Sequence, residues 1–476
     1  MDAPATPTAP PVPVTAFERR FGHPPGLAIL FFTEMWERFS FYGMRGLLKL
    51  YMVNYLFVTS RQVFQGGEER VAGNPDAIIG WSFVRGLLPA DATIQGNASV
   101  IYGWYVGLVY LTPLLGGILA DRLLGQRRTV IVGAVIMAIG HFVMAFEDWF
   151  FIALLLLILG NGAFKPNIST QVGNLYAEGD SRRDGAFTIF YMGINLGAFI
   201  TNLICGTLAM TMGWHWGFGA AGVGMVAGLV IYVLGQRYLA PDNVMTTKAT
   251  ASGAPAVKQP LSSTEWSRVG ALVVLCALNI VFWGVYEQQG NTMQTWADEQ
   301  TIWPTVAGFQ IPSTWFQSFN PFCIFLMAPF LDMFWRWQSR RGTEPSSVTK
   351  MAIGSAILGL SFIVMVVGAQ VVGDGQGSMF WPLVCTLLLT VGELYLSPIG
   401  LSLVTKVSPA RIVSMMMGMW FLSSFFGGLL SGYLGYFYDK MPKEGFFLVL
   451  TVLGLATGVA MWAFNKPLRK ALGHAV

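Results

Sequence analysis

Hydrophobic and polar positions form long blocks along this chain. Twelve apolar segments, each about 20 or more residues long, are separated by shorter polar stretches. About 20 apolar residues in a helix span the ~30 Å hydrocarbon core of a bilayer. The pattern therefore predicts an all-α polytopic membrane protein. The twelve segments are residues 27–57, 98–121, 129–147, 149–173, 185–212, 216–239, 267–291, 313–337, 349–373, 379–405, 411–438 and 445–465.

A polar stretch divides the twelve segments into two sets of six. Residues 240–266 are rich in Ala, Thr, Ser, Pro and Lys, which is the composition of a linker. Two halves of six helices joined in this way are typical of the major-facilitator fold. The predicted parts are a tail at 1–26, a six-helix bundle at 27–239 with a loop at 58–97, the linker at 240–266, a second bundle at 267–465 and a tail at 466–476.

The lysines and arginines decide the expected orientation. With the N-terminus inside, the inside segments hold 20 of the 29 basic residues and the outside segments hold five. Positive residues collect on the cytoplasmic side of membrane proteins. Both tails and the linker are therefore expected in the cytoplasm, and the loop at 58–97 outside. The tail 1–26 has no cleavable signal or organellar address, which favours a bacterial inner membrane.

Composition narrows the possible functions. The chain has 54% hydrophobic and 11% charged residues, and its net charge of +4 gives no case for a nucleic-acid partner. Four cysteines form no CxxC pair and four histidines lie far apart, so we expect no metal or other cofactor. The sequence contains no Gly-Lys dipeptide for a Walker A loop and no GxSxG elbow. An ion gradient is the remaining energy source, and lipid the expected surroundings.

Charged residues in a membrane segment are costly and usually functional. The first segment has the highest concentration of them, and at 100° per residue they cover an arc of about 140°. This stripe is expected to face the interior of the bundle. The alternative is a structural ion-pair seam, which is weaker because buried pairs stabilise less than apolar packing does. The stripe consists of Glu34, Glu37, Arg38, Phe41, Tyr42, Arg45 and Lys49.

Five further polar residues lie in the middle of other segments. Lys165 follows Gly160 and Gly162 closely and requires an anion, and its alternative role is that of a structural lysine. Glu287 and Glu393 are candidate proton sites, because desolvation favours the neutral form of a carboxyl group. The remaining two, Asn195 and Asn320, can recognise an amide or an amine, or can simply join helices.

The loop after the second segment has a recognisable pattern. Residues 117–128 match the GxLaDrxGrr motif of major-facilitator proteins. The acidic and basic residues of the motif are expected to form a gate network on the inside. The pattern indicates the fold and carries no information about the substrate. These residues are Asp121, Arg122, Arg127 and Arg128.

Three motifs resemble those of the proton-dependent oligopeptide transporters, a family within the major facilitator superfamily. Residues 34–43 are similar to the ExxERFxYYG motif, residues 190–197 to FYxxINxG, and residues 392–398 to GELxxSP. Together the motifs cover both halves of the chain. One departure is Phe41, which stands where the family usually has tyrosine. Another is the linker 240–266, which is too short for the two extra helices of many bacterial relatives.

The resemblance implies symport of di- and tripeptides with protons by alternating access. The peptide carboxylate would be held by Arg38, Tyr42 and Lys165, and the amino group by Asn195, Asn320 and Glu393. Side-chain pockets would be lined by Tyr110, Trp283, Trp420 and Ser424. Ion pairs closing the outer side would join Arg45 to Glu287 and Lys165 to Glu393. Proton coupling would involve Glu34, Glu37, Arg38 and Glu287.

Three other functions are weighed against this one. A transporter of the same fold for nitrate or an amino-acid-like metabolite is disfavoured by the complete ExxER motif, which nitrate carriers lack. A membrane enzyme would need a metal cluster or a nucleophile–base pair, and neither is visible. A channel or an assembly protein would not need paired acids and bases in both halves. We expect a monomer that is not an enzyme.

Overall fold

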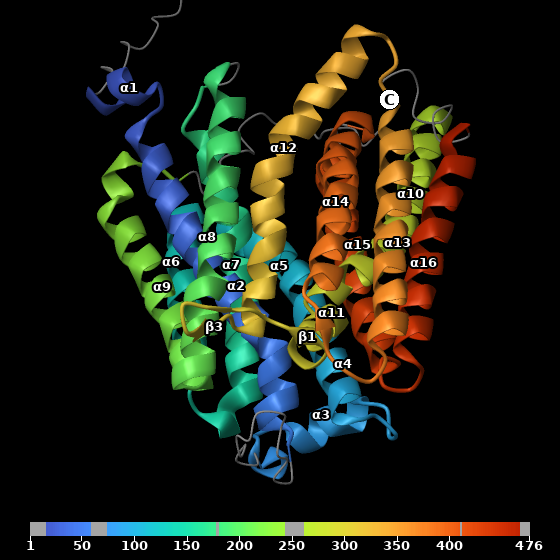
Figure 1. Cartoon of the computed structure of the whole chain (residues 1–476). Coiled ribbons are helices and arrows are strands. Elements are labelled where there is room, and N and C mark those ends of the chain that lie inside the picture. The colour runs from blue at the N-terminus through green and yellow to red at the C-terminus, as the bar shows by residue number, and fades with distance from the viewer. Residues whose placement is uncertain (1–15, 59–73, 178–179, 243–260, 410–411, 467–476) are drawn as a thin grey trace, which may run out of the picture.

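The computed structural model describes residues 16–58, 74–177, 180–242, 261–409 and 412–466. Parts of the predicted tails, of the loop 58–97 and of the linker lie outside these residues. Within them the architecture is helical apart from four two-residue strands, so the predicted fold class is confirmed. The helices stand side by side, with most of the N-terminal ones on the left of Figure 1 and most of the C-terminal ones on the right.

The first half of the described chain contains six long helices and the short α5. The second predicted segment begins before residue 98 and is divided into α4 and α5 by Pro113. Proline has no N–H for the helical ladder, so it is tolerated where one helix ends and another begins. The helices are α2 (Pro25–Tyr51), α4 (Ile94–Leu111), α5 (Pro113–Leu119), α6 (Gln126–Val143), α7 (Phe150–Asn174), α8 (Arg182–Met212) and α9 (Trp214–Leu234).

The second half has six long helices, and two of them begin with serine caps. Ser262 accepts a hydrogen bond from the Glu265 amide while the Glu265 side chain accepts from the Ser262 amide. This capping box satisfies two amides at the start of α10. Ser346 caps α13 by accepting one hydrogen bond from the Thr349 amide. The helices are α10 (Ser263–Tyr286), α12 (Phe316–Arg340), α13 (Ser347–Val372), α14 (Phe380–Val407), α15 (Val413–Tyr436) and α16 (Lys443–Ala463).

Short elements connect the long helices. The predicted loop 58–97 is not wholly irregular, since it contains α3 (Trp81–Leu87) and the first residues of α4. The other short helices are α1 (Ala16–Phe21), α11 (Thr292–Glu299), η1 (Met52–Leu56), η2 (Pro75–Ala77), η3 (Ala120–Leu124), η4 (Glu147–Trp149), η5 (Gln236–Tyr238), η7 (Glu287–Gln289) and η8 (Ser313–Trp315). Strand β1 (Thr301–Ile302) pairs in parallel with β4 (Gly377–Ser378), and β2 (Thr305–Val306) is antiparallel to β3 (Phe309–Gln310).

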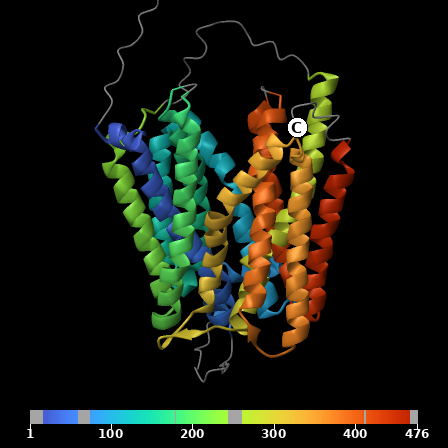
Figure 2. The same ribbon diagram turned by 45° about the horizontal axis from the view of Figure 1, so that its top comes forward.

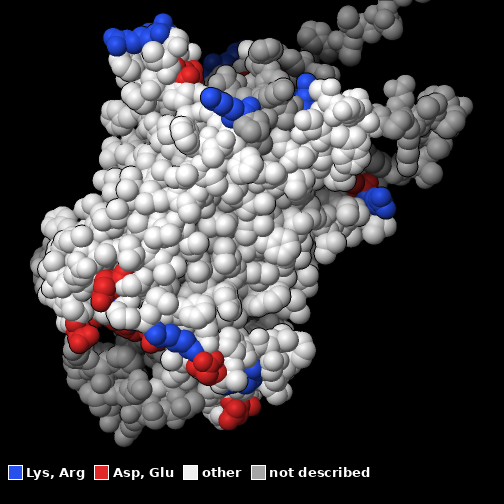
Figure 3. Space-filling model, turned by 90° about the vertical axis from the view of Figure 1, so that its right-hand side faces the viewer, with Lys and Arg blue, Asp and Glu red and all other residues white. Residues whose placement is uncertain are grey.

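Ten helical segments of the described chain are long and apolar enough to cross a membrane. Two further long helices, α2 and α6, stand among them, so twelve segments make up the bundle. Helix α2 carries the charged stripe and α6 begins with Arg127 and Arg128, which makes both less apolar. Figure 3 shows a broad uncharged region across the middle of one face, with charged residues toward its two ends.

Buried apolar residues form two separate cores. One consists of residues between Leu27 and Leu239, and the other of residues between Val269 and Met461. Figures 1 and 2 show most blue and green helices on one side and the orange and red helices on the other, with the blue α4 lying against the second half. Each half therefore has its own packed interior.

We call the end that carries Arg127, Asp242 and Ser347 the inner end, and the opposite end the outer end. The halves approach closely where α4 meets α15. A Cβ atom on Gly103 would collide with the backbone of Gly428 and Gly432. Only glycine permits two helix backbones to come this near, a packing mode common between membrane helices.

Candidate functional site

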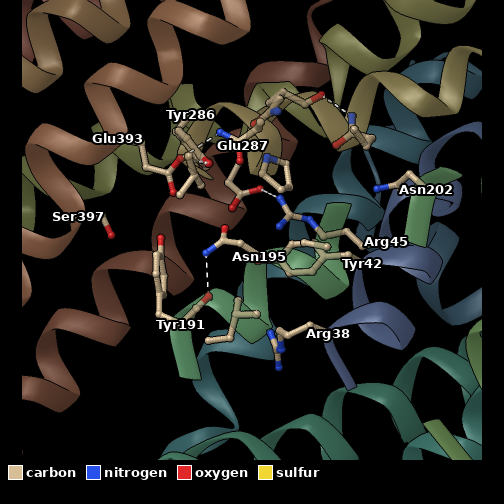
Figure 4. Close-up of a pocket in the computed structure, with 18 of the residues that line it drawn as sticks. Arg38, Tyr42, Arg45, Tyr191, Asn195, Asn202, Tyr286, Glu287, Glu393 and Ser397 are labelled. Carbon is tan, nitrogen blue, oxygen red and sulfur yellow. Dashed lines mark hydrogen bonds and ion pairs between the residues drawn. The ribbon is translucent and has the colours of Figure 1, made fainter. Parts of the chain in front are cut away.

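Two adjoining cavities of about 260 and 480 Å³ lie between the halves. Together they reach the size typical of small-molecule sites, roughly 300–1,000 Å³. Their walls come from α2, α4, α7 and α8 of the first half and from α10, α12, α14 and α15 of the second. Figure 4 shows side chains of α2 and α14 facing each other across this space.

The predicted substrate-binding residues all line these cavities. Arg38, Tyr42, Tyr110, Lys165, Asn195, Trp283, Asn320 and Glu393 line the first cavity. Trp420 and Ser424 line the second, which also shares Tyr110, Trp283 and Glu393. Arg45 and Glu287 line the first cavity as well, whereas Glu34 and Glu37 do not. The fold thus gathers these residues from eight helices, and their roles toward a ligand stay a prediction.

Helix α2 contributes a fully buried charged cluster. Arg38 Nε lies 3.2 Å from Glu34 Oε1 and donates to Glu37, and none of the three side chains is more than 2% exposed. Asn161 Nδ2 of α7 donates to Glu37 Oε1 at 3.2 Å. The guanidinium lies 5.0 Å from the centre of the Phe41 ring, at the position where related sequences usually have tyrosine. One arginine therefore serves two carboxylates and still faces the cavity.

The pairing of Arg45 with Glu287 is present and joins the two halves. Arg45 Nη2 donates to the Glu287 carboxylate, and Arg45 Nε donates to the Tyr102 hydroxyl at 2.9 Å. Glu287 is only 2% exposed. In Figure 4 a dashed line joins the two side chains. Separating the two halves here would leave each buried charge without its partner, which is unfavourable. The ion pair therefore favours the closed outer side.

Glu393 has neutral partners from two other helices. Its Oε2 accepts hydrogen bonds from the Tyr286 hydroxyl at 2.8 Å and from Asn320 Nδ2 at 3.1 Å. Asn320 Nδ2 also donates to Thr390 Oγ1 at 2.9 Å. Glu393 Oε1 accepts no hydrogen bond from the described residues and stays available to a ligand. Asn195 differs, since its Nδ2 donates to the Tyr191 carbonyl of its own helix.

The contacts of Lys165 differ from one sequence-based expectation. The predicted ion pair with Glu393 is not formed, and within the described ranges Lys165 has no ion-pair partner. Its ammonium group instead lies 5.1 Å from the centre of the Tyr110 ring. The two residues belong to opposite halves, and the cavity separates them. The outer side is closed in this structure without a contribution from this pair.

The charges of the cavity are divided between the halves. Arg38, Arg45 and Lys165 come from the first half, and Glu287 and Glu393 come from the second. Arg38 and Arg45 are neutralised by carboxylates, as described above. Lys165 and Glu393 are the cavity cation and the cavity anion that no described residue pairs. The cavity therefore presents a free positive charge on one wall and a free negative charge on the other.

The second cavity is largely apolar and aromatic. Trp283, Trp335 and Trp420 line it together with Tyr110 and Tyr191. Large aromatic walls offer dispersion contacts without demanding one shape, so they tolerate varied apolar groups. Trp335 lies toward the inner end of α12, and the second cavity therefore extends to the inner side.

Several cavity residues were missed by sequence reasoning. Tyr286 follows Trp283 by three positions and Tyr191 precedes Asn195 by four, so helical spacing from predicted residues could have indicated both. Ser397 belongs to the GELxxSP motif, and Gln289 and Gln317 are glutamines at helix ends that have no distinguishing pattern. All five line the first cavity.

The outer side of the molecule is held closed by polar contacts between the halves. Among the described residues, every hydrogen bond or ion pair that joins the halves lies on the outer side of the cavity or along its wall. Asn54 Nδ2 donates to Asp298 Oδ2 at 2.7 Å, and at the rim Asp91 accepts from the Tyr436 hydroxyl at 2.6 Å and from Lys440. These two hydrogen bonds lower the pKa of Asp91 to about 2. The structure is open inward and closed outward.

The inner loop motif makes a different set of contacts from the one expected. Arg127 donates from its amide to Asp242 Oδ1 at 3.0 Å and from Nε to the Ala240 carbonyl at 2.9 Å. In the part of the chain that the structure describes, Asp121 forms no ion pair with the motif arginines. Asp121 and Arg122 of η3 are exposed, and the partners of Arg127 belong to its own half. The gate network is not formed in this state.

The described residues contain no group of three or more His, Cys, Asp or Glu side chains that could hold a metal ion. The four cysteines are buried as free thiols.

Comparison with known proteins places the chain among transporters. The sequence profile of the POT family matches residues 127–252 and 238–451. A peptide transporter of Yersinia enterocolitica is 36% identical, with 87% of this chain and 88% of the relative covered. A di-/tripeptide transporter of Lactococcus lactis is 31% identical, with 95% and 97% covered. The crystal structure of a mutant peptide transporter POT in complex with alafosfalin has a TM-score of 0.81 at 32% identity, covering 97% of each chain.

Proposed function

Because the chain belongs to the POT family, we propose that it is a proton-coupled symporter that carries di- and tripeptides across the membrane. It is a multi-pass membrane protein and a transporter rather than an enzyme. The relatives named above as peptide and di-/tripeptide transporters support this choice of substrate. The basic residues at the inner end support an orientation with both termini in the cytoplasm, and the bacterial sources of the relatives support a bacterial membrane.

The observation that carries the proposal is the pair of free charges in the cavity. A peptide is a zwitterion, with one charged group at each end of a backbone of nearly constant length. Lys165, with Arg38 and Tyr42 beside it, faces the peptide carboxylate, and Glu393 with Asn320 faces the amino group. Charge-assisted hydrogen bonds at both ends orient any short peptide in the same way.

The aromatic part of the cavity accounts for tolerance of different side chains. A peptide whose ends are fixed projects its side chains into the space lined by Trp283, Trp335 and Trp420. A transporter of many peptides requires strong recognition of the constant ends and weak recognition of the variable parts. Asn195 of α8 lines the same cavity and would add an amide to the amine side.

Proton coupling is assigned to the buried carboxylates and the arginines that they hold. A proton on Glu287 would remove its charge and release Arg45, which weakens the outer closure and favours outward opening. In the α2 cluster a proton on Glu34 or Glu37 changes how firmly Arg38 is held, and Arg38 faces the substrate. Substrate and proton thereby act on connected residues.

Uptake of labelled dialanine into proteoliposomes tests the proposal. An inward proton gradient should drive accumulation above equilibrium, and an uncoupler should abolish it. Glu287→Gln should lose the gradient-driven accumulation of dialanine. Glu444→Gln, at the start of α16 and away from the cavity, should keep this accumulation. Folded protein that exchanges no dialanine in either direction would contradict the proposal. Transport of nitrate or of an amino-acid-like metabolite instead would show that the fold carries another substrate.

A further inference from the structure

Lys49 is a buried cation to which the proposed function assigns no task. It lies on α2 one turn beyond Arg45, and its side chain is 0% exposed. It forms no ion pair in the described part of the chain. A lysine withdrawn from water without a carboxylate is unfavourable for folding. Its position therefore calls for a role in which the ammonium group is used.

The partners of Lys49 are two groups of α4. Its Nζ donates to Ser99 Oγ at 2.6 Å and to the main-chain oxygen of Gln95 at 3.0 Å. Because an ammonium group only donates, the Ser99 oxygen must accept from it. The hydroxyl proton of Ser99 is then free to point elsewhere.

Both partner residues reach across to the second half. Ser99 Oγ donates to Asn291 Oδ1 at 2.9 Å, and Gln95 Nε2 donates to Thr295 Oγ1 at 3.0 Å. All of these groups are buried. Asn291 continues the chain of contacts by donating to the Ser431 carbonyl on α15. Lys49 is thus hydrogen-bonded to Ser99 and Gln95, the two α4 residues that donate to Asn291 and Thr295 of the second half.

The same arrangement occurs one helical turn away, around Arg45. There α2 supplies Arg45, α4 supplies Tyr102 and the second half supplies Glu287. Adding four positions on α2 leads to Lys49, and stepping back three on α4 leads to Ser99. Positions three or four apart share one face of a helix. On the second half, Glu287 lies in η7 and Asn291 is the N-cap of α11, so the chain turns between them. The contacts of these residues form two polar layers, one around Arg45 and one around Lys49.

We propose that Lys49 is the positioning residue of a second outer-gate layer, in which it orients Ser99 and Gln95 of α4 toward the α11 N-cap Asn291 and toward Thr295 of α11. The inference rests on the proposed function, since it assumes that the two halves open and close on the outer side. The second layer differs from the first layer in having no carboxylate. A proton on Glu287 can release Arg45, whereas the second layer holds by hydrogen bonds among neutral partners of one ammonium group.

Spin-label distances across the outer end test this layer without any transported substrate. Labels on Met212→Cys at the end of α8 and Phe380→Cys at the start of α14 report the separation of the halves. Both sites are more than half exposed, and the four native cysteines are buried. We expect Lys49→Met to raise the ratio of outward-open to outward-closed molecules about tenfold, as when two hydrogen bonds are weakened together.

The matched control is Lys443→Met, an outer lysine that donates to Asp439 within its own half and should leave the distances unchanged. If Lys49→Met does not fold, Ser99→Ala removes the relay while keeping the lysine, and it should shift the distances in the same direction. Folded Lys49→Met or Ser99→Ala protein with unaltered distances would overturn the inference. Failure of dialanine uptake in the unaltered protein would instead affect only the proposed function.

Discussion

At the scale of single residues, the informative side chains are those whose charge no neighbour cancels. Lys165 and Glu393 face one cavity from opposite halves, and the described residues leave both without an ion pair. The other cavity cations, Arg38 and Arg45, are held by carboxylates. A buried charge retained without a partner is unfavourable for the empty protein. The proposed ligand, with one charge at each end, supplies both missing partners.

Glu393→Gln should weaken binding of dialanine by roughly 10- to 100-fold, the loss expected for a hydrogen bond to a charged group. The substitution keeps the size of the side chain but removes the charge that faces the peptide amino group. Isothermal titration in detergent measures the affinity directly. Glu444→Gln, which removes a carboxylate outside the cavity, serves as the control. Unchanged affinity in the folded variant would place the amine site elsewhere.

Asp91 at the outer rim gives a pH prediction with a defined sign. Its pKa is lowered to about 2 by hydrogen bonds from Lys440 and Tyr436. A lowered pKa means that the contact stabilises the closed rim above the ordinary Asp range near pH 4 and loses this effect as the pH falls toward 2. Between pH 5 and 8 the rim contact should therefore not change.

Uptake by Asp91→Asn should accordingly differ from that of the unaltered protein by no more than about fivefold, since exposed ion pairs contribute little. The ratio of the two rates should be the same at each pH from 5 to 8. Asp76→Asn in the exposed η2 turn is the matched control. A ratio that varies across this range would mean that the rim takes part in the pH response.

At the scale of elements, proline residues mark the helices that can change shape. Pro166 lies inside α7, Pro398 inside α14, and Pro321 and Pro329 inside α12. Each removes one backbone hydrogen bond from its helix and permits a bend. Figure 1 shows that α12 changes direction along its length toward the inner end. These helices carry Lys165, Asn320 and Glu393, so bending moves the ligand-facing residues.

Pro329→Ala tests the importance of this bend. Pro329 is exposed on the bundle surface, so the substitution loses little packing and restores a helical hydrogen bond. We expect dialanine uptake to slow roughly three- to tenfold if helix bending limits the transport cycle, while binding affinity stays unchanged. Pro442→Ala, at the N-cap of α16, restores no helical bond and is the control. Equal uptake rates for the two variants would show that α12 moves as a rigid body.

At the scale of the whole molecule, the two halves contact each other mainly on the outer side. The glycines of α4 and α15 bring the backbones together, and polar layers from Arg45 to Asn54 continue to the rim. The second cavity reaches the inner end, where the cross-half bonds of the described residues are missing. The molecule is therefore closed at the outer end and open toward the inner end, as one state of the proposed alternating-access cycle would be.

A single cysteine can report this state. Ser397→Cys lies where the two cavities meet, so a membrane-impermeant maleimide should label it at least about tenfold faster from the inner side than from the outer side. Right-side-out and inside-out vesicles provide the two sides. Phe380→Cys at the outer start of α14 should show the opposite preference. Equal labelling of Ser397→Cys from both sides would contradict the inward-open state.

Features carried by contiguous residues could be predicted from the sequence. A block of apolar residues must become a helix in a bilayer, because only helices and closed barrels satisfy their own backbone there. The stripe from Glu34 to Lys49 was assigned to the bundle interior because helical periodicity places its members on one face. Arg45 and Glu287 were paired only through a family resemblance, since 242 positions separate them.

The arrangement across the two halves was decided by the tertiary structure. Lys165 and Glu393 have the residue types for a pair, yet the cavity between them keeps them apart, and no local pattern reports that separation. The role proposed for Lys49 depends on its hydrogen bond to Ser99 and on the bond from Ser99 to Asn291. These groups meet only when α2, α4 and α11 pack together. Sequence periodicity fixes which face of a helix is polar. Which group lies opposite that face depends on how far the two halves have closed.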